Sequence, residues 1–110
     1  MVKEITLQSL RYDYNAKNFR DVINGCKVLL EKETNLLECD ILLGSALLLS
    51  EEYSEGKDVY LGIIKKYQHF PSDVYYNLSS AYKNLYNLKD SLFYARQYVN
   101  HNTNNIAGYL

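Results

Sequence analysis

Hydrophobic residues along this chain recur every three or four positions, which places them on one face of an α-helix. Near the N-terminus Leu7, Leu10 and Tyr14 follow this spacing, and short polar turns separate the later apolar segments. Pro71 disfavours a helical conformation in the residue before it. The pattern predicts helices over residues 4–15, 19–32, 36–50, 53–68, 73–85 and 88–101, with Ser72 and Asp73 as the N-cap of the fifth.

One arrangement of residues occurs three times along the chain. An aromatic residue or a leucine follows a polar turn at Phe19, Tyr53 and Leu88, which are 34 and then 35 positions apart. Residues of the same helical stripe stand seven and ten positions after each of these: Cys26 and Leu29, Tyr60 and Ile63, and Ala95 and Tyr98. A period of this length is typical of helix pairs that stack on one another and share a core.

The repeats cover nearly the whole chain and indicate a single domain over residues 1–110. We place the three units at about 4–36, 37–71 and 72–105. The run of Asn and Thr from Asn102 to Asn105 is expected to break the last helix, because these residues favour turns over helix interiors. Residues 106–110 are then expected to begin a further helix.

The third unit resembles the tetratricopeptide repeat. The matching positions are Tyr75, Leu78, Ser79, Tyr82, Ser91, Ala95 and Tyr98. The second unit is similar through Leu43, Gly44, Gly56 and Tyr60, although Asp40 and Leu47 stand where the family has aromatic residues, and the first unit is matched at fewer positions. The resemblance implies an all-α fold, a right-handed superhelix of three antiparallel helix pairs of the α-solenoid type.

In that family the first helix of each pair lines a concave groove that binds a protein or peptide. The resemblance therefore implies a partner-binding surface made of Gln8, Tyr12, Asn15, Ile41, Ser45, Leu48, Leu49, Tyr76, Ser80, Lys83 and Asn84. Apolar residues in the middle of this set favour an amphipathic helix or an extended segment as the guest. The alternative is that neighbouring helices cover these side chains. Gln8 and Tyr12 stand where a carboxylate-binding member would need Lys and Asn, which argues against that mode.

Composition and charge narrow the classes of partner. Twelve Lys and Arg against thirteen Asp and Glu give a net charge of −1, so neither nucleic acid nor an anionic membrane surface is expected as a partner. No apolar run approaches the roughly 20 residues that cross a bilayer. The N-terminal residues lack the apolar stretch of a secretory signal, and we expect a cytoplasmic setting.

Residues capable of chemistry are scattered along the chain. Cys26 and Cys39 have neither a zinc-binding nor a redox spacing and are expected to be small core residues. His69 and His101 lie at the ends of different predicted helices, and no nucleophile stands beside them. The glycines lie singly within predicted helices and form no phosphate loop. The sequence thus predicts a protein that is not an enzyme and needs no metal or cofactor.

The leading functional hypothesis is a non-catalytic adaptor or chaperone that holds a partner in its groove. In size and in its apolar groove the chain is similar to small tetratricopeptide chaperones of bacterial type III secretion. A second hypothesis is a targeting or regulatory segment of a larger enzyme. A third is a self-associating scaffold, for which a homodimer formed through the C-terminal face is a candidate.

Overall fold

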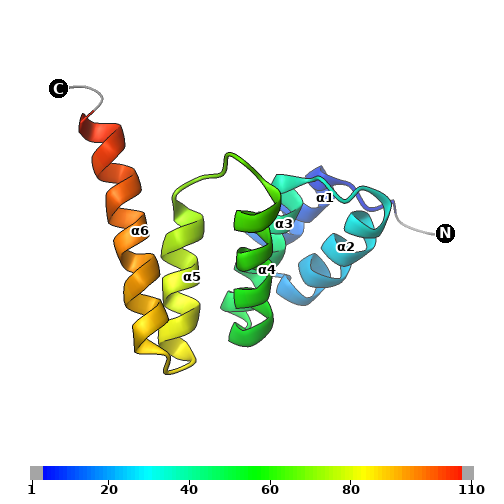
Figure 1. Ribbon diagram of the computed structural model, residues 1–110. Helices are drawn as coiled ribbons and strands as arrows, with labels where there is room; N and C mark the ends of the chain where they lie inside the picture. The colour runs from blue at the N-terminus through cyan, green and yellow to red at the C-terminus, as the bar shows by residue number, and fades with distance from the viewer. Residues whose placement is uncertain (1–3, 108–110) are drawn as a thin grey trace.

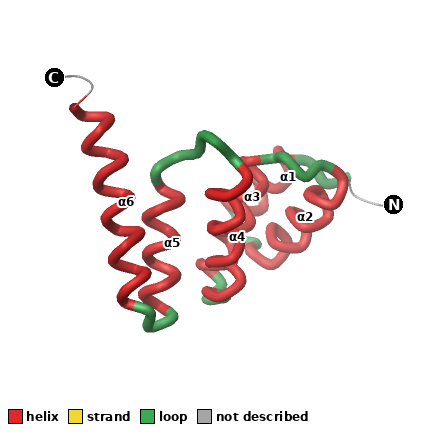
Figure 2. The backbone as a smooth tube through the Cα atoms, in the orientation of Figure 1, coloured by secondary structure: helices red, strands yellow, loops and turns green. Residues whose placement is uncertain are grey.

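The computed structural model describes residues 4–107, which form helices joined by short loops (Figures 1 and 2). Within this range every regular element is α-helical, as the hydrophobic pattern predicts. The molecule is elongated, with extents of 53 × 34 × 24 Å. The helices are α1 (Leu7–Asn15), α2 (Phe19–Lys32), α3 (Leu37–Leu49), α4 (Tyr53–Lys66), α5 (Asp73–Asn84) and α6 (Leu88–Ala107).

Each helix packs against the next one in the chain, so the order in space follows the order in sequence (Figure 1). Helix α3 also contacts both α1 and α5. The backbones of α2, α4 and α6 do not approach one another in this way in the described part of the chain. The first helices of the three pairs therefore lie side by side along one side of the stack.

The same turn joins the two helices of each pair. Its central residue has a positive φ, 65° at Lys17, 63° at Glu51 and 60° at Tyr86. The next N–H group donates back to a carbonyl oxygen five residues earlier, over 2.8 Å, 2.8 Å and 2.9 Å in the three turns. This bond satisfies a carbonyl that the ending helix leaves without a partner. The turns thus recur at the sequence period, and Phe19, Tyr53 and Leu88 each begin the second helix of a pair.

Two clusters of buried apolar side chains hold the stack together. The first is formed by Leu10, Val22, Ile23, Cys26, Cys39, Leu43, Ala46 and Leu47, and the second by Tyr60, Ile63, Val74 and Leu78. Val59 packs against both clusters, so the core is continuous from α1 to α5. Cys26 and Cys39 are both free and fully buried, as expected for small core residues.

Asp40 is a charged residue at the edge of the core, where the family resemblance would place an aromatic. Only 8% of its surface is exposed. Its carboxylate accepts a hydrogen bond from the Tyr67 hydroxyl at 2.6 Å and pairs with the Lys66 ammonium at 2.9 Å. A buried carboxylate needs such partners to compensate for lost hydration. The backbone becomes extended at Tyr67, which ends α4 two residues before the expected bound.

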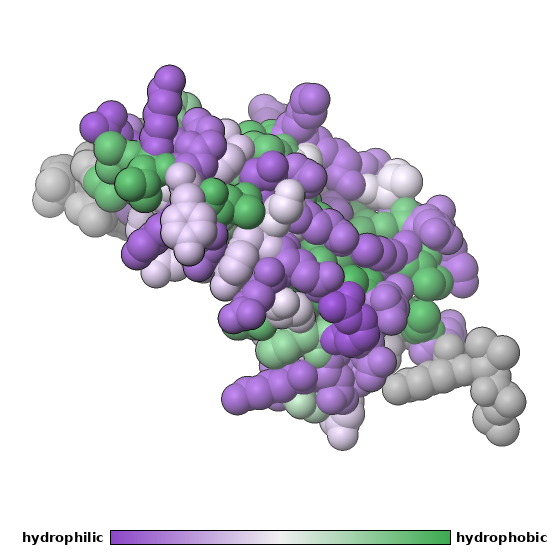
Figure 3. Space-filling view, turned by 90° about the horizontal axis from the view of Figure 1, so that it is seen from below, coloured by the Kyte–Doolittle hydropathy of each residue, from purple (hydrophilic) through white to green (hydrophobic). Residues whose placement is uncertain are grey.

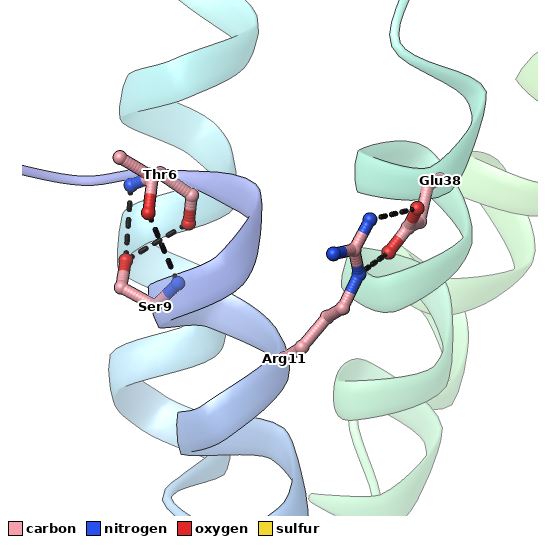
Figure 4. A network of polar contacts seen from close by, with 4 residues as sticks. All are labelled: Thr6, Ser9, Arg11 and Glu38. Carbon is pink, nitrogen blue, oxygen red and sulfur yellow. Dashed lines mark hydrogen bonds and ion pairs between the residues drawn. The ribbon is translucent and has the colours of Figure 1, made fainter.

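Helix α1 begins at Leu7, three residues later than the pattern predicts, because Thr6 caps it. The Thr6 hydroxyl accepts from the Ser9 N–H at 3.0 Å, and the Ser9 hydroxyl accepts from the Thr6 N–H at 2.9 Å (Figure 4). This reciprocal pair is a capping box. On the next turn Arg11 forms a two-bonded ion pair with Glu38 of α3, which links the first helices of two pairs (Figure 4).

The expected break at residues 102–105 is wrong, since α6 continues without interruption to Ala107. A further helix therefore does not begin at Ile106, and residues 108–110 lie outside the described range. Asn and Thr cost only a few tenths of a kcal/mol in an established helix, far less than Pro. The Ser72 hydroxyl also donates to the Asn102 side-chain oxygen at 3.0 Å, which ties this part of α6 to the start of α5. Ser72 is the N-cap residue of α5, as expected, but its side chain makes no capping hydrogen bond.

Candidate functional site

A cleft of about 380 Å³ opens between the first helices of the pairs, with α4 at its floor. Its walls combine apolar and polar side chains from four helices and the loop before α5. The lining residues are Tyr14, Ile41, Leu42, Ser45, Tyr60, Pro71, Asp73, Val74 and Asn77. A concave surface that is mostly apolar, with a few convergent polar groups, is the usual form of a binding site.

Beside the cleft, a small residue of α3 faces a large residue of α4. Gly44 has no side chain, and the ring of Tyr60 occupies the space beside it, with Cζ 2.9 Å from the place a Cβ would take. Tyr60 thus reaches across from α4 to the side of the first helices. The Tyr14 and Ser45 hydroxyls hydrogen-bond at 2.6 Å and fix α1 against α3 at the rim.

The Tyr60 hydroxyl is the most unusual polar group in this cleft. The residue is fully buried, and its oxygen makes no hydrogen bond of good geometry with the described residues, although the Asn77 side chain lies close to it. Burial raises the pKa of this hydroxyl well above its usual range, so it carries its proton at neutral pH. A buried polar group without a partner costs about 1–3 kcal/mol, which is rarely kept without a reason.

Two polar residues of α5 face the same cleft. Asp73 and Asn77 are four residues apart and therefore lie on one side of the helix. Asn77 offers both a donor and an acceptor, and Asp73 carries the only formal charge in the lining. The lining holds neither a His nor a Cys, and Asp73 is its one carboxylate.

Ile41 and Ser45, both predicted from the sequence, line this cleft. Leu48 does not. It is half-buried, packs against the second core cluster, and its Cδ2 would lie 2.8 Å from a Cβ on Gly56. Leu49, one residue on, is 54% exposed. Neighbouring helices thus cover part of the apolar middle of the predicted surface, as the alternative interpretation of the sequence expects.

The remaining predicted residues lie outside the cleft. Gln8 and Tyr12 line a separate shallow hollow with Thr6 and Ser9. Asn15 is exposed on the last turn of α1, and the exposed ring of Tyr76 lies 5.5 Å from that of Tyr98 on α6. The Asn84 amide donates to the Ser80 carbonyl at 2.9 Å within α5, and Lys83 is exposed beside them. The structure therefore divides the predicted surface into several parts.

No protein-family model matches this chain, and no curated protein matches its sequence.

Seven cleft residues were missing from the predicted surface, and four of them carry polar groups: Tyr14, Tyr60, Asp73 and Asn77. The sequence marks Tyr60 as a core residue, and the structure adds that this buried residue also lines the cleft. The four-residue spacing of Asp73 and Asn77 could have identified them from the sequence, because it places both side chains on one side of a helix. Within residues 4–107 no group of three His, Cys, Asp or Glu side chains could hold a metal ion. None of the described helices is long and apolar enough to cross a membrane.

Proposed function

We propose that this chain is a non-catalytic protein-binding module of the tetratricopeptide type, which holds a partner's helix or extended peptide in the cleft between α1, α3 and α5. Its stack would then be a right-handed superhelix with the first helices on the inner side. The recurring turns and the serial contact of α1, α3 and α5 support this arrangement. The free, buried thiols of Cys26 and Cys39 favour a reducing compartment such as the cytoplasm.

The observation that carries the proposal is the unpartnered Tyr60 hydroxyl, which is shielded from solvent beneath the lining of an apolar cleft. A small shift of the lining side chains would let a carbonyl or carboxamide oxygen of the guest accept its hydrogen bond and remove the cost of leaving it unmade. Asn77 can pair with a second polar group of the guest, while the half-buried side chains of Ile41 and Leu42 contact apolar side chains. Asp73 favours a guest with a basic residue nearby.

The test uses peptides selected on the immobilised chain from a random library displayed on phage. Tyr60→Phe keeps the ring and removes only the hydroxyl. We expect this variant to bind the selected peptides about tenfold more weakly, which is the loss of one hydrogen bond of about 1.4 kcal/mol. Its own free energy of unfolding should rise by about 1 kcal/mol, because the unpaired group is gone.

A second variant and a matched control separate the cleft from the rest of the surface. Asp73→Asn, at an exposed position of the cleft, should weaken the binding of basic peptides. Asp58→Asn, on the outer side of α4, should leave their binding unchanged. Peptides that bind the wild type, Tyr60→Phe and Asp73→Asn equally well would contradict the proposal. So would a failure to select any peptide.

A further inference from the structure

Helix α6 carries an apolar stripe that nothing covers in the described structure. Leu88, Leu92 and Val99 are 70%, 53% and 57% exposed, and Ala95 lies between them on the same side of the helix. Arg96 stands beside the stripe and makes no ion pair within the described residues. Hydrophobic side chains reach the surface near both ends of the molecule in Figure 3.

The opposite end of the stack has a groove of complementary character. A hollow of about 390 Å³ between α1 and α2 is lined by apolar Ile5, Leu10 and Val28 and by acidic Glu4, Asp13 and Asp21. We call this the N-terminal groove. Asp21 makes no ion pair within the described residues. An apolar stripe with a cation and an apolar groove with acids are matched in both hydrophobicity and charge.

Ion pairs join the first helix pair to the second, and they provide a model for contact between an apolar surface with cations and one with acids. Lys27 of α2 pairs with Glu55 of α4 at 3.0 Å, and Arg20 pairs with Glu52 at 2.8 Å. The Arg11–Glu38 pair completes the set. In all three, the cation belongs to the first helix pair and the acid to the second.

The unpaired charges at the two ends occupy equivalent places in the repeat. Lys27 is the ninth residue of α2, and Arg96 is the ninth residue of α6. Glu55 is the third residue of α4, and Asp21 is the third residue of α2. Arg96 and Asp21 therefore occupy the positions that Lys27 and Glu55 have in the internal ion pair. They lie at opposite ends of one molecule.

The apolar residues follow the same correspondence. Leu92 and Ala95 are the fifth and eighth residues of α6, where α2 has Ile23 and Cys26. Both α2 residues are fully buried in the first core cluster, which they share with side chains of α3. The stripe on α6 thus has the positions of an interface, and no helix of the described residues covers it.

We propose that copies of this chain associate head to tail, with α6 of one copy seated in the N-terminal groove of the next and Arg96 paired with Asp21 of that copy. This inference is independent of the proposed cleft function. Because the two surfaces differ, the contact does not close into a symmetric dimer and generates open chains of copies. It extends the internal stacking of helix pairs across the boundary between molecules.

Sedimentation velocity on charge-reversal variants tests this directly. We expect the wild type to grow beyond a dimer as its concentration rises. Arg96→Glu and Asp21→Lys should each remain monomeric, because each places like charges at the contact. An equimolar mixture of the two should assemble again, since the acid introduced in one variant then meets the cation introduced in the other, and the native pair forms at the alternate contacts. Lys65→Glu, an equal charge change on exposed α4, should assemble as the wild type does.

Three results would overturn the inference. The first is a wild type that stays monomeric at every concentration. The second is a wild type that stops at a dimer and is insensitive to Asp21→Lys, which would indicate pairing of two α6 stripes. The third is a mixture that stays monomeric although both variants retain full helicity by circular dichroism. If Asp21→Lys loses helicity, Asp21→Asn replaces it in the experiment. This variant should assemble more weakly than the wild type.

Discussion

The ring of Tyr60 lies directly against Gly44, so that a Cβ at position 44 would be 2.9 Å from the Tyr60 Cζ atom. This contact brings α3 close to α4 and places Tyr60 in the lining of the cleft. Gly44→Ala should lower the free energy of unfolding by about 1 kcal/mol or more, because overpacking of a fully buried ring outweighs the better helix propensity of Ala. Urea denaturation followed by circular dichroism measures it.

Gly62→Ala is the matched control, also within a helix and replaced by the same residue. No atom lies within 4 Å of the place its Cβ would take. Only helix propensity then remains, and the variant should be more stable by up to about 1 kcal/mol. Equal effects at the two glycines would contradict the described packing of Tyr60.

Tyr86 is strained in the turn between α5 and α6, with a φ of 60° and 92% of its surface exposed. Glycine adopts this conformation without steric cost. Tyr86→Gly should therefore raise the free energy of unfolding by about 1 kcal/mol, measured by urea denaturation. Tyr86→Ala removes the same ring but keeps the strained backbone, and it should give no such gain. A gain of equal size in both variants would point to the ring instead of the backbone.

Asp40 should contribute more to stability than the exposed carboxylates do. Asp40→Ala removes the acceptor of the Tyr67 hydroxyl and the partner of Lys66, and we expect a loss of about 2 kcal/mol. Glu38→Ala breaks an ion pair whose side chains are 52% and 44% exposed, and it should cost less than about 1 kcal/mol. Thermal or urea unfolding of the two variants distinguishes these values. A smaller loss for Asp40→Ala than for Glu38→Ala would contradict the described burial.

Stability should fall at alkaline pH because several tyrosines are held in their neutral form. Burial raises the pKa of Tyr60, Tyr67, Tyr82 and Tyr94, and the bond to Asp40 raises that of Tyr67 further. The unfolded chain loses these protons first, near pH about 10, so the free energy of unfolding decreases as the pH rises beyond that value. Urea midpoints at about pH 8 and about pH 11 test this. An unchanged midpoint would contradict the burial of these hydroxyls.

The hydrophobic period predicted the helices well where local signals decide their ends. Helix α2 begins at Phe19 and ends at Lys32 as expected, since polar turn residues flank its apolar stripe on both sides. Helix ends that depend on tertiary contacts could not be predicted from the hydrophobic pattern. The end of α4 depends on the Tyr67–Asp40 bond, and the course of α6 through Asn102 is supported by Ser72 of a distant segment.

The candidate site was predicted only in part for a related reason. Ile41 and Ser45 were found because they lie on the side of a first helix that the repeat pattern identifies. Tyr60 was placed in the core, which is correct for its ring. Tyr60 also lines the cleft because Gly44 makes room for its ring, and that depends on two residues from different helices.

Binding in the cleft is tested most directly by amide chemical shifts of the ¹⁵N-labelled chain during titration with a library-selected peptide. We predict that the largest changes occur at residues 41–45 of α3 and 73–77 of α5, and that Tyr60→Phe reduces them at equal peptide concentration. Changes confined to the outer sides of α2 and α4, or to the α6 stripe, with the α3 and α5 signals unmoved, would contradict it.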